Sequence, residues 1–115
     1  MAALPDLERA EAARVALTKA SYAAEVYAGD WVVARYAEFV KERRLRERLG
    51  ALLAQDEAEA MNSYVEAAGK GAAIVLVPTQ SGSDVELEQI RSHLALHGGR
   101  LIRYYGPTFF RDLLG

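Results

Sequence analysis

Apolar and polar positions along the chain recur with two different periods, and the switching between them predicts an α+β fold. Spacings of three and four residues, typical of a helix with one buried face, recur in four segments. These segments are Leu7–Ala20, Trp31–Arg48, the stretch from Asp56 to Ala68, and the stretch from Ser83 to about His97. The remaining apolar runs are short and indicate strands.

Three runs are predicted as strands. Tyr22–Ala28 alternates with a period of two, as expected for a strand with two different faces. Ala72–Val77 is apolar at every position, which predicts a central strand buried on both faces. Arg100–Tyr105 is the last predicted strand. Met1–Leu4 is short and apolar, and it is either a further strand or a loose terminus.

Polar residues and glycines mark where the helices begin and end. Asp6 and Asp30 are predicted to cap the first two helices. Ser83 and Glu86 have the spacing of a capping box before the fourth. Gly98-Gly99 is predicted to end that helix in a left-handed conformation.

Two stretches of the chain share one plan and end in Tyr-x-Gly. Tyr27-Ala28-Gly29 aligns with Tyr104-Tyr105-Gly106, 77 residues later, and the same offset places Leu17 on Leu94 and Arg14 on Arg91. Each unit reads strand, helix, strand. Two such units predict a single ferredoxin-like domain over residues 1–115, written βαβ-(αα)-βαβ. Its antiparallel sheet would carry an inserted helical pair, formed by the second and third helices.

The second unit resembles a known family. The residues that carry the resemblance are the apolar run Gly71–Val77, the acidic start Asp84–Glu88, the helix end His97-Gly98-Gly99 and the closing Tyr104-Tyr105-Gly106. In these features residues 71–106 resemble the C-terminal half of a bacterial domain family of general stress or heat-induced stress proteins. The resemblance implies a small β-α-β fold and an association with stress, and it supplies no catalytic residues.

Composition excludes several kinds of chemistry. The 115 residues include no cysteine, which removes disulfides, thiolate catalysis and iron–sulfur clusters. The formal net charge of -2 gives no general attraction to nucleic acid or to anionic membranes. Met1–Asp6 does not have the pattern of a signal peptide, and the longest apolar stretch, Gly71–Pro78, is too short to span a bilayer. We therefore expect a cytoplasmic protein without a membrane partner.

Candidate metal and catalytic groups are few. His93 and His97 stand four residues apart on one helix, a spacing that can hold a metal, but no third ligand is identifiable. The acidic cluster Asp56, Glu57 and Glu59 lies at a predicted helix start, where acidic side chains are favoured without any catalytic role. We expect neither an enzyme nor a bound metal or cofactor.

Two further segments could contact phosphate groups. The run Lys41–Arg48 is rich in arginine, but its spacing also suits ion pairs within a helix. Ser81-Gly82-Ser83 precedes a helix, but Asp84, Glu86 and Glu88 would repel an anion there. The sequence therefore disfavours nucleic-acid binding.

The family resemblance and the absence of a catalytic constellation give the leading functional hypothesis, and aromatic residues add self-association to it. Tyr27, Trp31, Tyr104, Tyr105 and Phe109 all lie at or just after the two Tyr-x-Gly corners. Aromatic side chains in such positions suit a protein contact surface, and dimers are the commonest assemblies. We expect a non-enzymatic, stress-associated interaction protein that forms a homodimer. The alternatives are a regulatory module that binds a small molecule and a weak nucleic-acid binder that uses Lys41–Arg48.

Overall fold

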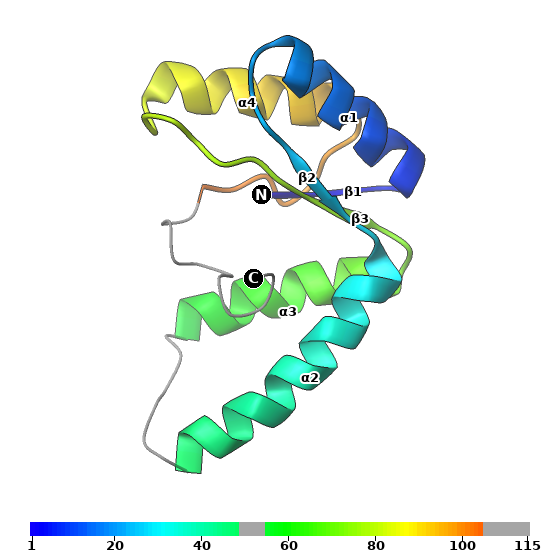
Figure 1. The fold of residues 1–115 in the computed structure, drawn as a ribbon, viewed down its shortest axis with the longest axis vertical. Coiled ribbons are helices and arrows are strands. Elements are labelled where there is room, and N and C mark those ends of the chain that lie inside the picture. The colour runs from blue at the N-terminus through cyan, green and yellow to red at the C-terminus, as the bar shows by residue number, and fades with distance from the viewer. Residues whose placement is uncertain (49–54, 105–115) are drawn as a thin grey trace.

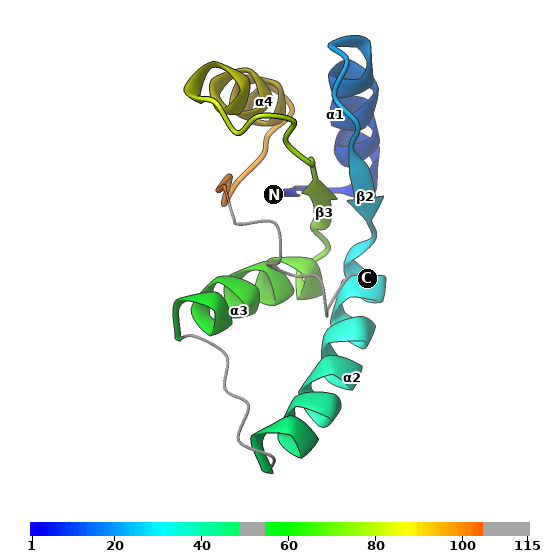
Figure 2. The same cartoon turned by 60° about the vertical axis from the view of Figure 1, so that its left-hand side comes forward.

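The computed structural model describes residues 1–48 and 55–104 and shows an α+β fold in three layers (Figure 1). A three-stranded antiparallel sheet lies between two pairs of helices. The elements are β1 (Ala2–Leu4), α1 (Leu7–Lys19), β2 (Glu25–Tyr27), α2 (Gly29–Arg48), α3 (Gln55–Gly69), β3 (Ala73–Leu76) and α4 (Asp84–Leu96). Figure 2 shows α1 and α4 on one side of the sheet and α2 and α3 on the other.

The sheet is organised around β3. Its strand order is β1-β3-β2, and both outer strands run antiparallel to the central one. Ile74 faces Ala3 on one side and Tyr27 on the other. The prediction that the apolar run near residue 75 forms a central strand is confirmed, and the first residues of the chain form a strand as well.

Successive side chains of each strand point to opposite faces, and this alternation builds two separate cores. Ala2 and Leu4 pack beneath α1 and α4, together with Val75 from β3. Ala3 and Ile74 pack on the other face, against the residues that α2 and α3 contribute. Those residues are Val32, Phe39, Met61, Tyr64 and Ala68.

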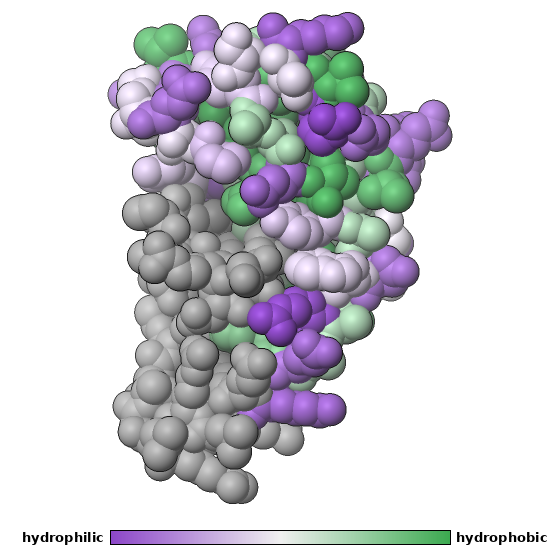
Figure 3. All heavy atoms as spheres, in the orientation of Figure 1, coloured by the Kyte–Doolittle hydropathy of each residue, from purple (hydrophilic) through white to green (hydrophobic). Residues whose placement is uncertain are grey.

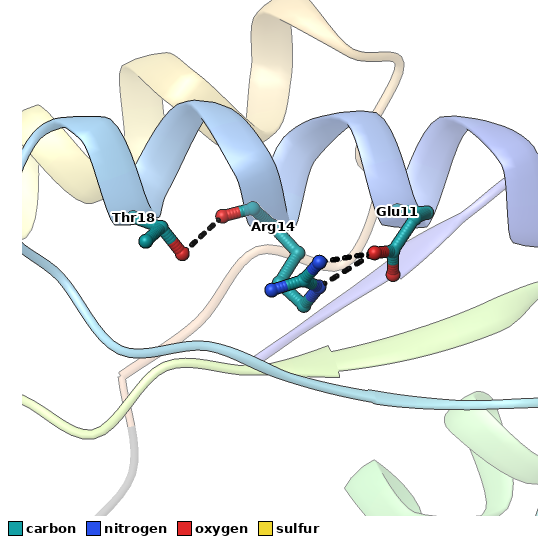
Figure 4. A network of polar contacts seen from close by, with 3 residues as sticks. All are labelled: Glu11, Arg14 and Thr18. Atoms are coloured by element: carbon teal, nitrogen blue, oxygen red, sulfur yellow. Dashed lines mark hydrogen bonds and ion pairs between the residues drawn. The ribbon is translucent and has the colours of Figure 1, made fainter.

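The two pseudo-equivalent leucines occupy equivalent places. Leu17 of α1 and Leu94 of α4 are both fully buried in the core between these helices and the sheet. The two aligned arginines make different contacts. Arg14 pairs with Glu11 on its own helix and accepts the Thr18 hydroxyl at its carbonyl oxygen, 2.9 Å away (Figure 4). Arg91 instead donates to the Ile102 carbonyl oxygen at 3.3 Å.

The segment after α4 pairs with β1 through a bulge rather than a regular strand. Ala3 and Arg100 exchange backbone hydrogen bonds of 2.8 and 2.7 Å, and the Arg103 N–H reaches the Met1 carbonyl oxygen at 3.0 Å. Two residues, Leu101 and Ile102, therefore stand opposite Ala2 alone. Leu101 takes a left-handed conformation with φ of 53°, as one residue of a bulge often does. The predicted strand over 100–105 is thus reduced to a single bridge within the described residues.

Two predicted boundaries were wrong. The predicted strand from Tyr22 begins only at Glu25, because Ser21 turns left-handed and the Tyr22 N–H still bonds the Leu17 carbonyl oxygen at the end of α1. Asp30 does not precede its helix. It lies within the first turn of α2, where its carboxylate accepts from the Trp31 N–H at 2.9 Å.

The start of α2 is pressed against the turn that joins α3 to β3. A Cβ added at Gly29 would lie 2.4 Å from the Ala72 carbonyl oxygen and 2.6 Å from that of Ala68. Contacts below 3 Å with backbone atoms force the backbone to move. Only glycine therefore allows β2 to pass directly into α2 at this point.

We predict that Gly29→Ala lowers the free energy of unfolding by about 1–3 kcal/mol, the usual cost of forcing extra atoms into a packed site. The measurement is urea-induced unfolding followed by circular dichroism. Gly69→Ala is the matched control, because no atom lies within 4 Å of its added Cβ. Equal stability of the two variants would contradict the close approach of α2 to the turn.

Candidate functional site

Two of the predicted aromatic residues meet where β2 passes into α2. The rings of Tyr27 and Trp31 stack with centroids 5.1 Å apart and an interplanar angle of 27°. Trp31 remains 42% exposed. The Tyr27 hydroxyl donates to the Glu25 carboxylate at 2.5 Å, so these two side chains share one face of β2. We call Glu25, Val26, Tyr27 and Trp31 the β2 corner.

The Tyr27 phenol is held in its neutral form. Loss of solvent around the ring, the hydrogen bond to Glu25 and the negative charge of that carboxylate raise the pKa of Tyr27 to about 12. Each effect disfavours a phenolate. At neutral pH the hydroxyl is therefore a hydrogen-bond donor.

The hydrogen-bond pattern of the sheet determines which backbone groups β2 presents to its outer side. Ala3 exchanges hydrogen bonds with Arg100, so the backbone of Ala3 points away from β3. Antiparallel strands alternate between paired and outward-facing residues. This alternation can be followed along the register from β1 through β3 to β2. The backbone N–H and C=O of Tyr27 then point toward Ile74, and those of Val26 point outward. Among residues 1–48 and 55–104, no other strand pairs with this outer side of β2, so the β2 corner is a sheet edge of the described fold.

Tyr104 lies at the opposite edge of the sheet from the β2 corner. The segment that contains Arg100 pairs outside β1, so three inter-strand spacings, or about 14 Å, separate it from β2. Tyr104 is 56% exposed, and a Cβ at Gly82 would lie 3.3 Å from its hydroxyl oxygen. Tyr105 and Phe109, the other two predicted contact residues, lie outside the described residues.

The loop before α4 is occupied by a carboxylate of the chain itself. Glu86, 7% exposed, accepts from the N–H groups of Gln80 and Ser81 at 2.5 and 2.8 Å and from the Ser81 hydroxyl at 2.6 Å. The predicted capping box is therefore half formed, because Ser83 caps the Glu86 N–H at 3.3 Å but Glu86 binds the loop instead of Ser83. These donors, led by the Ser81 hydroxyl, lower the pKa of Glu86. The loop that the sequence suggested as a phosphate site is therefore already occupied by a carboxylate of the same chain.

A groove that the sequence did not reveal runs between α3 and the edge formed by β1 and the bulge. Its volume is about 530 Å³. One face of α3 with Lys70 just after it forms one wall, and the end of β1, Ala72 before β3 and the bulge form the other. The lining residues are Ala3, Leu4, Pro5, Ser63, Glu66, Ala67, Lys70, Ala72, Arg100 and Leu101. We call it the α3 groove. The i, i+3, i+4, i+7 spacing of the α3 residues was visible in the sequence, but their partner strand was not.

The remaining candidates from sequence are not assembled into a site. His93 lies in the last turn of α4 and His97 at its C-cap, and within residues 1–48 and 55–104 no three metal-ligating side chains come together. The basic run falls on the described backbone of α2, but its side chains from residue 42 onward lie outside what is described, as do those of Asp56, Glu57 and Glu59. None of the described helices is long and apolar enough to cross a membrane.

No family model, curated protein or solved structure matches this chain. The link to stress proteins therefore stays a prediction from the resemblance of residues 71–106.

We predict that the single tryptophan reports the ionisation of Tyr27. A tyrosinate stacked on Trp31 accepts its excitation energy, so Trp31 fluorescence should fall with a midpoint near pH 12. Because the pKa is raised on folding, the unfolded chain releases this proton first, and stability should decline as the pH rises from 10 to about 12. In Tyr27→Phe the quenching step should disappear. A midpoint at pH 10 in the wild type would contradict the desolvated, hydrogen-bonded phenol.

We predict a second pH dependence at Glu86. A lowered folded-state pKa adds stability above the ordinary value of 4.5, and this stability is lost as the pH falls through the lowered pKa. Wild type should therefore be more stable than Glu86→Gln at pH 7, and the two should converge in acid. Thermal unfolding at several pH values measures this difference. Glu88→Gln is the control on the same helix, and an equal loss in that variant would argue against the loop contacts.

Proposed function

We propose that this chain is a non-enzymatic interaction protein that forms a homodimer through the β2 corner. The observation that carries the proposal is the outer edge of β2, which no described strand pairs with and where Val26 directs its N–H and C=O outward beside an exposed, stacked tryptophan. An unpaired strand edge is a template for adding another strand. A role in stress follows only from the resemblance described above.

The topology supports a ferredoxin-like interpretation of the fold. If the segment at Arg100 is counted as a fourth strand, the order is 4-1-3-2, with β3 and β1 in the middle. Each β-α-β unit then places its helix, α1 or α4, on the same face of the sheet. The helical pair α2 and α3 covers the other face.

The β2 edge is self-complementary about a twofold axis through Val26. Antiparallel pairing of β2 with its copy would give two hydrogen bonds between the Val26 backbones. In the same register Glu25 lies opposite Tyr27 of the second copy, so the single phenol proton, which is donated to Glu25 of its own chain, can instead be donated to Glu25 of the second copy. Side chains at such positions are close enough to contact.

An exposed apolar side chain beside the edge adds contact area. Trp31 on the first turn of α2 stacks on Tyr27 and is 42% exposed. Figure 3 shows green apolar surface between charged side chains over the upper half of the molecule, where α1, α4 and the sheet lie. A three-residue strand limits the number of backbone hydrogen bonds. We therefore expect a dissociation constant on the order of 10 μM, in the range of small transient interfaces.

Because the chain has no cysteine, one introduced thiol tests the twofold axis directly. Val26→Cys should form a disulfide-linked dimer under mild oxidation, since paired residues in an antiparallel ladder have Cα atoms about 5.5 Å apart. Val85→Cys on α4, 69% exposed, is the control for random collision. If Val26→Cys cross-links no faster than Val85→Cys, β2 does not pair with itself.

Light scattering across micromolar concentrations tests the dimer without cross-linking. Tyr27→Lys places a charge at the proposed edge and should weaken the dimer by about tenfold or more, because edge lysines oppose strand pairing. Tyr104→Lys, at the other edge of the sheet, should leave the dissociation constant within about twofold. A wild-type chain that stays monomeric at every concentration would remove the proposal.

A further inference from the structure

The α3 groove combines an aliphatic lining with three charged side chains. Most of its wall is formed by alanines, Leu4, Pro5 and Leu101. Glu66 on the last turn of α3 and Lys70, the residue after this helix, form an ion pair of 3.2 Å on one wall. Arg100 stands on the other wall, and no described residue forms an ion pair with its guanidinium. One positive charge is therefore left over.

The wall that carries Arg100 is held in a fixed and unusual conformation. Leu101, the next residue, takes a φ of 53°, which costs a leucine free energy. Tyr64, 2% exposed, donates its hydroxyl to the Leu101 carbonyl oxygen at 2.5 Å and so ties the bulge to α3. The Arg100 backbone is fixed by its two hydrogen bonds with Ala3. The arginine thus projects from a rigid support beside an apolar groove.

These features define the charge and shape of a ligand. A guanidinium binds a carboxylate through two parallel hydrogen bonds. The alanines and leucines of the lining suit an aliphatic body, and a volume of about 530 Å³ lies within the range of small-molecule sites. Glu66 opposes a second negative charge, which disfavours a phosphate dianion. A ligand that carries only a positive charge would be repelled by the positive charges of Arg100 and Lys70.

We propose that the α3 groove binds a small aliphatic monocarboxylate, with the carboxylate on Arg100 and the aliphatic body against Ala3, Ala67 and Leu101. This site lies between α3 and the β1 edge, and the β2 corner lies across the sheet from that edge. Binding here does not depend on dimer formation.

Titration of the ¹⁵N-labelled full chain with isovalerate, followed by NMR, tests the site. We expect amide shifts at Ala67, Lys70 and Leu101, with a dissociation constant of about 1 mM, as suits a ligand of this size. 3-Methylbutylamine, which has the same aliphatic body and the opposite charge, should cause no such shifts. Absence of isovalerate shifts in the groove, or equal shifts with inorganic phosphate, would overturn the proposal.

Two arginines in similar backbone settings provide the matched variants. Arg100→Gln keeps the backbone bonds to Ala3 and should weaken isovalerate binding by about tenfold or more. Arg103→Gln keeps its bond to Met1 and should change the affinity by less than about twofold. Unchanged amide spectra in the absence of ligand verify that both variants are folded. Equal affinities in the two variants would exclude Arg100 as the carboxylate contact.

Discussion

The burial of β3 on both faces is the constraint on which the rest of the structure depends. Four apolar residues form the middle of the sheet, and both cores meet on them. Val75 faces α1 and α4, and Ile74 faces α2 and α3. A polar side chain at either position would be buried without a partner. Without this strand, neither pair of helices would have a large apolar surface to pack against.

The sequence predicted those parts of the fold that depend on local pattern. All four helices and the central strand follow from periodicity, and Asp6, Ser83 and Gly98 act at the helix ends as their residue types suggest. The errors arose at a helix end, where a local hydrogen bond extended the turn, and at the last strand, where a tertiary contact changed the pairing. The predicted strand from Tyr22 lost its first residues to the end of α1, and the bulge at Leu101 replaced a regular strand because β1 pairs there with unequal numbers of residues.

The candidate sites were predictable only in part. The sequence placed Tyr27 and Trp31 at the same Tyr-x-Gly corner, and the two rings do stack there. The outward direction of the Val26 backbone could not be foreseen, because it depends on the pairing of β1 with both of its neighbours. The α3 groove was hidden for a similar reason. Its walls come from segments about 30 to 65 residues apart in the chain, and nothing in the sequence relates Lys70 to Arg100.

The strand order also affects the course of folding. β1 and β2 do not pair with each other, and each forms its ladder with β3, which lies about 45 to 75 residues later in the chain. Contacts of such long sequence separation slow folding, because a large loop must close before they form. During synthesis on the ribosome, both early strands must therefore wait, unpaired, until β3 has left the exit tunnel. In that interval α1 has no completed sheet against which to dock.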